Sequence, residues 1–154
     1  MLPTLGAARL TEGGGFTTAE VRGAAGSFTI HGERSQATPG TAAWSPLREF
    51  RFEARGRVLV LRLDDLDPHR GLYHPIPPER LTETEAAGWR DLLGEAWRLI
   101  VDHLPDYADI LPTGLTSIVP NPAVPFRLPS ASTGEAFGSA VIAGPEAEEP
   151  ATLA

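Results

Sequence analysis

The sequence predicts an α+β fold, in which antiparallel strands and a β-hairpin accompany one long amphipathic helix. Two segments rich in branched and aromatic residues, 47–53 and 57–63, are separated by a short turn that contains Gly56. Strand-like runs on either side of a tight, glycine-containing turn are typical of a hairpin. The segment 81–104 instead repeats its apolar residues every three or four positions, which is the period of a helix.

The helix predicted over 81–104 has start and stop signals in the sequence. Thr82 and Glu85 have the spacing of a capping box, and Pro105 ends the helix. One face carries the apolar side chains that we expect to enter the core, which are Trp89, Leu92, Leu93, Ala96, Trp97 and Ile100. The acidic side chains of this segment, such as Asp91, fall on the other side and predict a solvated face.

Shorter elements complete the predicted fold. Strands are expected at 27–31, 115–119 and 136–143, with a weaker element at 16–21. Loops rich in proline, glycine or polar residues are expected at 32–45, 63–78 and 120–129. Residues 106–111 are expected to add one helical turn.

The composition fits one domain and argues against several classes of function. The 154 residues include 20 Asp and Glu, 13 Arg, no Lys and no Cys, which gives a net charge of −7. An acidic chain without a basic stripe is unsuited to nucleic acid, and a chain without Cys has no disulfide or thiolate metal site. No apolar run has the length of a membrane span and no signal peptide is visible, so we expect a cytoplasmic protein without a membrane partner.

Candidate chemistry begins with the four histidines, which are His31, His69, His74 and His103. His31 and Glu33 have the His-x-Glu spacing used by some iron oxygenases, but this spacing is short and common, so a solvated strand end is the favoured explanation. The segment 64–74 combines three Asp with two His, all ligand types for divalent metals, although Asp-rich loops with Pro and Gly are usually just solvated. Within this segment, a substrate-facing role for His74 is the stronger expectation.

No complete catalytic motif is present. The sequence has no HExxH, CxxC, Walker or GxGxxG motif and no evident nucleophile–base pair. The residues alone therefore assign no catalytic residue and no metal ligand.

Several separate segments resemble one known family. They are GLYHPIP at 71–77, LLGEAW at 92–97, Ile118-Val119-Pro120, and SASTGEAFG at 130–138 before a small-residue strand and a Leu-Ala ending. This order resembles the HEXXH-motif domain proteins, also described as α-ketoglutarate-dependent HExxH-type peptide β-hydroxylases. The resemblance implies a ribosomally made precursor peptide as substrate, with Fe(II) and 2-oxoglutarate as cofactors. It covers roughly residues 44–154 of what we expect to be a single domain, and residues 1–43 stay a poorly defined strand and loop region.

This chain departs from the family at the motif itself. In the family, the helix with the HExxH motif follows the segment that ends this sequence, and none of the histidines here has the H-E-x-x-H context. No metal ligand or catalytic residue therefore carries over, and the resemblance implies an incomplete N-terminal portion that is inactive as it stands.

The resemblance also implies that the strand 136–143 lines a peptide-binding cleft. We expect Phe137, Gly138 and Ser139 to line that cleft, and Ser130 and Ser132 to reach it from the preceding loop. The alternative is that these residues only shape a tight turn. For the whole chain, two further functions stay open: an HExxH metallopeptidase fragment, or a non-catalytic peptide-binding or accessory module.

Overall fold

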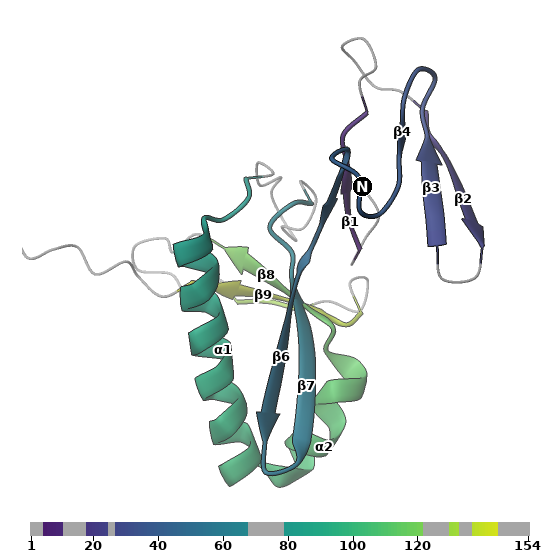
Figure 1. The fold of residues 1–154 in the computed structure, drawn as a ribbon. Helices are drawn as coiled ribbons and strands as arrows, with labels where there is room; N and C mark the ends of the chain where they lie inside the picture. The colour runs from purple at the N-terminus through teal and green to yellow at the C-terminus, as the bar shows by residue number, and fades with distance from the viewer. Residues whose placement is uncertain are drawn as a thin grey trace, which may run out of the picture. The chain divides into compact units, whose positions relative to one another are not determined.

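The computed structural model describes residues 5–10, 18–24, 27–67, 79–121, 130–132 and 137–144. Within these residues the chain is α+β, with two helices and nine strands (Figure 1). It divides into two compact units, Met1–Arg48 and Glu49–Ala154. None of the described helices is long and apolar enough to cross a membrane.

The first unit holds two small antiparallel sheets. One pairs β1 (Gly6–Ala8) with β5 (Trp44–Pro46). In the other, β3 (Ser27–His31) lies between β2 (Glu20–Ala24) and β4 (Gln36–Ala37). A small core of Ile30, Ala37 and Trp44 forms in this unit, and the ring of Phe28 meets Trp44 edge-on, with 5.1 Å between the ring centroids.

These strands confirm one prediction and correct two others. The strand predicted at 27–31 is present as β3. The loop predicted over 32–45 contains β4 and β5, because Ala37 and Trp44 bury their side chains there and bring their backbone into sheets. The weak element predicted at 16–21 occurs later, as β2, and residues 16–17 lie outside the described part of the chain.

The second unit is built on a four-stranded sheet with the order β6-β7-β8-β9. β6 (Arg48–Ala54) and β7 (Arg57–Leu63) form the predicted hairpin. The two turn residues, Arg55 and Gly56, have φ values of 46° and 77°, as a type I′ turn requires. β8 (Ser117–Asn121) pairs parallel with β7, and β9 (Ser139–Ala143) pairs parallel with β8. The sheet is therefore mixed, whereas the sequence predicted antiparallel strands.

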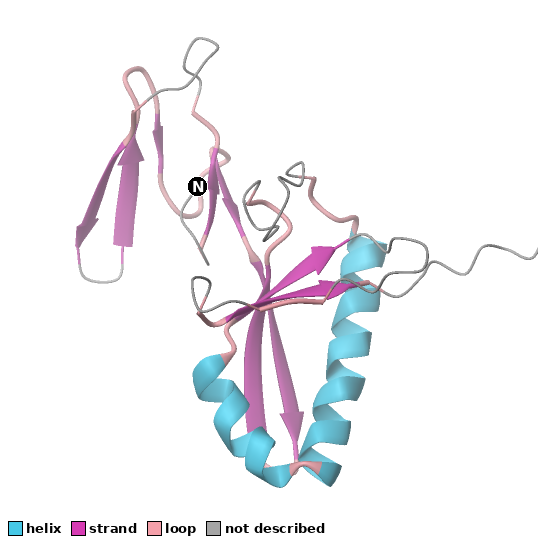
Figure 2. Ribbon diagram, turned by 180° about the vertical axis from the view of Figure 1, so that it is seen from behind, coloured by secondary structure: helices cyan, strands magenta, loops and turns pink. Residues whose placement is uncertain are grey.

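Two helices connect β7 with β8, because a parallel pair needs a long crossover between its strands. α1 (Glu83–His103) runs beside the hairpin in both views (Figures 1 and 2). Its capping box is as predicted: the Thr82 hydroxyl accepts from the Glu85 N–H at 3.2 Å, and the Glu85 carboxylate accepts from the Thr82 N–H at 2.8 Å. α2 (Pro105–Gly114) has ten residues, so the single turn predicted at 106–111 was too short.

The core of the second unit lies where α1 and α2 meet the sheet. Its buried members are Phe52, Leu59, Leu61, Leu63, Ala86, Trp89, Trp97, Val101, Ala108 and Ile118. Trp89 and Trp97 are in this core, as predicted. Leu92 and Ala96 are exposed, in contrast to the prediction, because they lie about 60° and 20° beyond Trp89 on the side away from the other buried residues.

Candidate functional site

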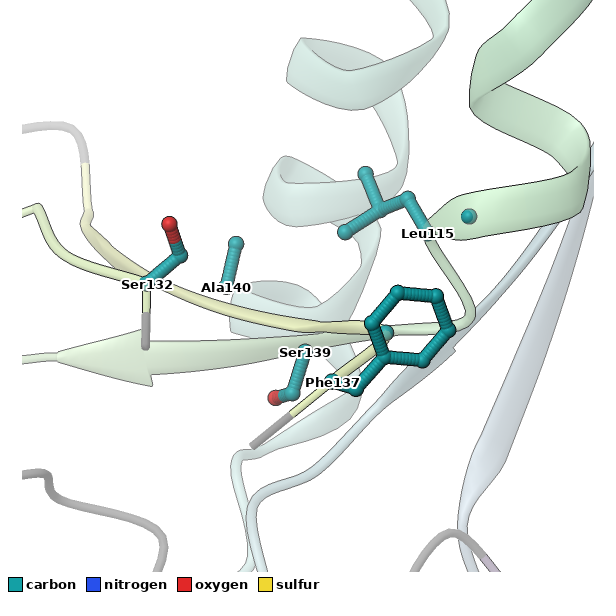
Figure 3. A pocket seen from close by; sticks show the side chains of 7 residues that line it. Leu115, Ser132, Phe137, Ser139 and Ala140 are labelled. Atoms are coloured by element: carbon teal, nitrogen blue, oxygen red, sulfur yellow. The ribbon is translucent and has the colours of Figure 1, made fainter. Parts of the chain in front are cut away.

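A pocket opens where α2 ends and β9 begins. It has a volume of about 270 Å³ and is lined by Gly114, Leu115, Ser132 and residues 137–140. Leu115 and Phe137 lie near the end of α2, and Ser132 and Ala140 lie farther from it (Figure 3). Segments that are distant in the sequence therefore meet in one small hollow.

Four residues proposed from the sequence line this pocket together: Ser132, Phe137, Gly138 and Ser139. Ser130 is exposed and is not among the lining residues. His74 lies outside the described residues. The sequence did not point to Gly114 and Leu115 as site residues, because Leu115 was predicted only as the first residue of the strand at 115–119.

Gly138 shapes the floor of the pocket. Its φ of +82° lies in the left-handed region, where a residue without a Cβ is favoured. Its carbonyl oxygen accepts from the backbone N–H groups of Thr116 and Ser117 at 2.8 and 2.9 Å, and from the Thr116 hydroxyl at 3.0 Å. A Cβ at this position would lie 2.9 Å from the Thr116 Oγ1. Glycine therefore allows the turn that holds the start of β9 against β8.

Phe137 presents an aromatic ring to solvent beside the pocket. Its exposed fraction is 85%, whereas Leu115 and Ala140, which also line the pocket, pack partly into the core. Covering a Phe side chain is worth roughly 1.5–3 kcal/mol relative to leaving it in water. An exposed ring at the rim of a hollow is thus a suitable contact for an apolar ligand group.

The backbone of β9 adds hydrogen-bonding groups next to the pocket. β9 is the last strand in the sheet order, and β8 pairs with only one of its edges. On the other edge, the N–H and C=O of Val141 pair with Ala131 at 2.9 and 3.0 Å. Because strand backbone groups alternate in direction, those of Ser139 and Ala143 point to the same edge as those of Val141. Because Ala131 already occupies the middle of this edge, an extended chain can pair here only with Ser139, beside the pocket, or with Ala143.

An ion pair between α2 and the hairpin helps to position the pocket. The Arg57 guanidinium donates to both carboxylate oxygens of Asp109, at 2.7 and 3.3 Å. The hydrogen bond from Arg57 lowers the pKa of Asp109 below its ordinary value. Since the end of α2 forms one wall of the pocket, this contact links that wall to β7.

Two buried carboxylates follow β7, at the carboxyl end of the strand. Asp65 is 0% exposed, and its Oδ2 accepts from the Leu81 N–H at 3.0 Å. The Asp64 Oδ1 accepts from the N–H groups of Leu66 and Asp67, at 3.3 and 3.1 Å. The solvated loop expected here is therefore wrong for these two residues, because nearby backbone donors draw the carboxylates inward. Asp65 anchors the residue that precedes the N-cap of α1.

The described residues do not fit a metal centre. Among them, no group of three or more His, Cys, Asp or Glu side chains could hold a metal ion. His31 and Glu33 belong to the first unit, His103 is exposed in the last turn of α1, and His69 falls outside the described residues. Asp64 and Asp65 direct carboxylate oxygens to backbone N–H groups. The described part of the chain therefore contains no ligand set suited to Fe(II).

Comparison of the chain with models of protein families, with curated protein sequences and with solved structures gives no match. Its function is therefore inferred from the pocket, from the strand edge beside it and from the resemblance in the sequence.

Proposed function

We propose that this chain binds an extended peptide at the pocket beside β9, as the peptide-binding portion of a peptide-modifying protein of the HExxH type. The observation that carries the proposal is the combination of the exposed Phe137 ring, a small pocket and a strand edge at one place. Each of the three suits a different part of a peptide. The pocket suits one apolar side chain, the Phe137 ring suits a second apolar surface beside it, and the strand edge suits the main chain.

The size of the pocket favours a single side chain over a cofactor. Pockets for drug-sized ligands have volumes of roughly 300–1,000 Å³, and this one has about 270 Å³. None of the described residues that line it is charged, and Leu115, Phe137 and Ala140 make much of its wall apolar. An aliphatic or aromatic side chain therefore fits better than a charged one, with the hydroxyls of Ser132 and Ser139 available to the adjacent peptide groups.

The expected affinity is modest. Burying one apolar side chain contributes roughly 1.5–3 kcal/mol, whereas a micromolar dissociation constant corresponds to about 8 kcal/mol. Hydrogen bonds from the β9 edge must supply part of the difference. A dissociation constant on the order of 10–1,000 μM is expected for a short peptide that uses only the pocket and this edge.

The resemblance to HExxH-type peptide β-hydroxylases supports a peptide as the ligand. On this proposal, the metal-binding helix of such a protein would follow β9, and Fe(II) with 2-oxoglutarate would supply the oxidation of a peptide held along that strand. The described residues of this chain do not fit that metal, so the activity proposed for the chain itself is peptide binding. The same activity is common to the metallopeptidase and accessory-module alternatives.

A titration of labelled peptides tests the proposal. Fluorescein-labelled ten-residue peptides with Leu or Phe at the centre should bind the full chain saturably by fluorescence anisotropy, and peptides with Ser at the centre should bind at least about fivefold more weakly. Ser132→Trp, which fills the pocket from an exposed position, should reduce binding by about tenfold or more. Val60→Ser, a change at an exposed apolar residue on β7, should leave it unchanged.

Two results would overturn the proposal. One is the absence of saturable binding for every peptide with an apolar centre. The other is binding that is equally strong in the wild type and in Ser132→Trp, since a ligand of the pocket cannot tolerate a filled pocket.

A further inference from the structure

We infer that the peptide ligand is cationic and carries a second apolar residue two positions from the first, which packs on the exposed flank of α2 at Ile110. This inference rests on the proposed function, because the first apolar residue is the one that occupies the pocket. It adds a specificity rule for the ligand.

The flank of α2 leads directly to the pocket. Ile110 and Tyr107 are 65% and 63% exposed, while Ala108 on the other side of the helix is buried. Ile110 lies four residues before Gly114, which lines the pocket, and residues four apart share one face of a helix. Tyr107 lies three residues before Ile110 and extends the same face. Two large apolar side chains thus continue the apolar surface away from Leu115 and Phe137.

The spacing of the two contacts sets the spacing in the peptide. At a rise of about 1.5 Å per residue, Ile110 and Tyr107 lie about 6 and 10 Å from Gly114 along the helix axis. An extended peptide advances about 3.3 Å per residue. A second apolar side chain two residues from the first lies on the same side of the extended peptide and, at about 6.6 Å, reaches Ile110.

Charge complementarity identifies the kind of peptide. Residues 49–154 include 9 Arg and 17 Asp and Glu, a net charge of −8, whereas residues 1–48 include 4 Arg and 3 Glu, a net charge of +1. Asp106 adds an exposed carboxylate next to Tyr107, whereas Arg55 and Arg57 neutralise the carboxylates of Asp102 and Asp109. This field attracts a basic peptide and repels an acidic one. It also disfavours a second copy of this acidic chain as the occupant of the apolar flank.

Matched peptides separate the two contacts. The probes are ten-residue peptides in which Arg-rich flanks surround two Leu placed two positions apart. The comparison peptides are the same except that one Leu is replaced by Ser. A third set keeps both Leu and replaces the Arg flanks with Glu. The two-Leu peptides should bind about five- to tenfold more tightly than the one-Leu peptides. The Glu-flanked set should bind more weakly than either at low salt, and this difference should shrink as salt is added.

Variants of the protein assign the second contact to α2. Ile110→Ser should remove the preference for two Leu, so that both peptides bind with the weaker affinity. Leu99→Ser is the matched control, because Leu99 is an exposed helical leucine on α1, and it should keep the preference intact.

The outcomes distinguish this inference from the function on which it rests. If one-Leu and two-Leu peptides bind equally, or if Ile110→Ser retains the preference, the second contact is refuted. Loss of binding in Ser132→Trp would then still support the proposal that the first apolar residue of the peptide occupies the pocket. If Glu-flanked peptides bind as tightly as Arg-flanked ones at low salt, the charge rule is refuted. If no peptide binds at all, both the proposed function and this inference are refuted.

Discussion

Replacement of Trp97 tests the assignment of the core of the second unit. Trp97 is 1% exposed and belongs to the cluster formed by α1, α2 and the sheet. Truncating a buried Trp or Phe to Ala costs about 3–5 kcal/mol, and a domain of ordinary stability unfolds at about 5–15 kcal/mol. Trp97→Ala should therefore remove about a fifth or more of the stability of this unit.

A second substitution at Trp97 separates the cost of the cavity from the effect of the buried indole N–H on stability. Within the described residues, the buried indole Nε1 of Trp97 has no hydrogen-bond partner. A buried donor without a partner costs about 1–3 kcal/mol, so removing it offsets part of the cavity left by a smaller ring. Trp97→Phe should therefore cost less than about 1.5 kcal/mol, well below the cost of Trp97→Ala.

Urea unfolding followed by far-UV circular dichroism measures both effects. Leu99→Ala is the control, because it lies on the same helix with half of its side chain exposed, and it should change the free energy of unfolding by no more than about 0.5 kcal/mol. A cost below about 1 kcal/mol for Trp97→Ala would refute the assignment of this residue to the core. Equal costs for the Phe and Ala variants would refute the argument from the indole N–H.

Three further predictions concern α1 and the pocket. Thr82→Ala should cost about 1 kcal/mol in urea unfolding, because it removes the side chain that caps the Glu85 N–H. Hydrogen bonds from the hydroxyl and N–H of Thr82 lower the pKa of Glu85 in the folded state. Their contribution should be present above the unfolded pKa of about 4.3 and be lost as pH falls through the folded pKa, so Glu85→Gln should flatten the acid side of a stability–pH curve. Gly138→Ala should weaken peptide binding in the anisotropy titration and lower the melting temperature, because its Cβ would crowd the Thr116 hydroxyl at a positive φ. Unchanged pH dependence in Glu85→Gln, or wild-type peptide affinity in Gly138→Ala, would contradict the corresponding prediction.

The sequence predicted those features whose causes are local. The hairpin turn at Arg55-Gly56 and the capping box at Thr82 depend on neighbouring residues, and both are present. The parallel pairing of β7, β8 and β9 depends on contacts across long connections, and the alternation of strand residues does not encode it. The exposure of Leu92 has a similar origin. Its spacing correctly predicts a helix, but the sheet covers the neighbouring face of that helix, which carries Trp89 and Trp97.

The candidate site likewise contains residues that were predicted from the sequence and residues that were not. Phe137, Gly138 and Ser139 are consecutive residues near a predicted strand start, and the family resemblance, which implies a cleft along that strand, pointed to all three. Gly114 and Leu115 reach the same pocket from the end of α2, more than twenty positions earlier in the chain, and no local pattern marks them. The burial of Asp65 likewise depends on Leu81, sixteen residues away, and on the strand that carries it into the sheet.

The mixed sheet also has a consequence for how the second unit folds. The β6–β7 hairpin closes across a two-residue turn, and such hairpins form within about 1–10 μs. β8 can join β7 only after the whole segment 64–116 has brought its two helices back to the sheet, and β9 must follow β8. Pairings between segments so distant in the chain form slowly. The pocket requires both β9 and the end of α2, so it forms only after β8 and β9 have joined the sheet. Peptide affinity should therefore appear late in refolding, after the helical signal.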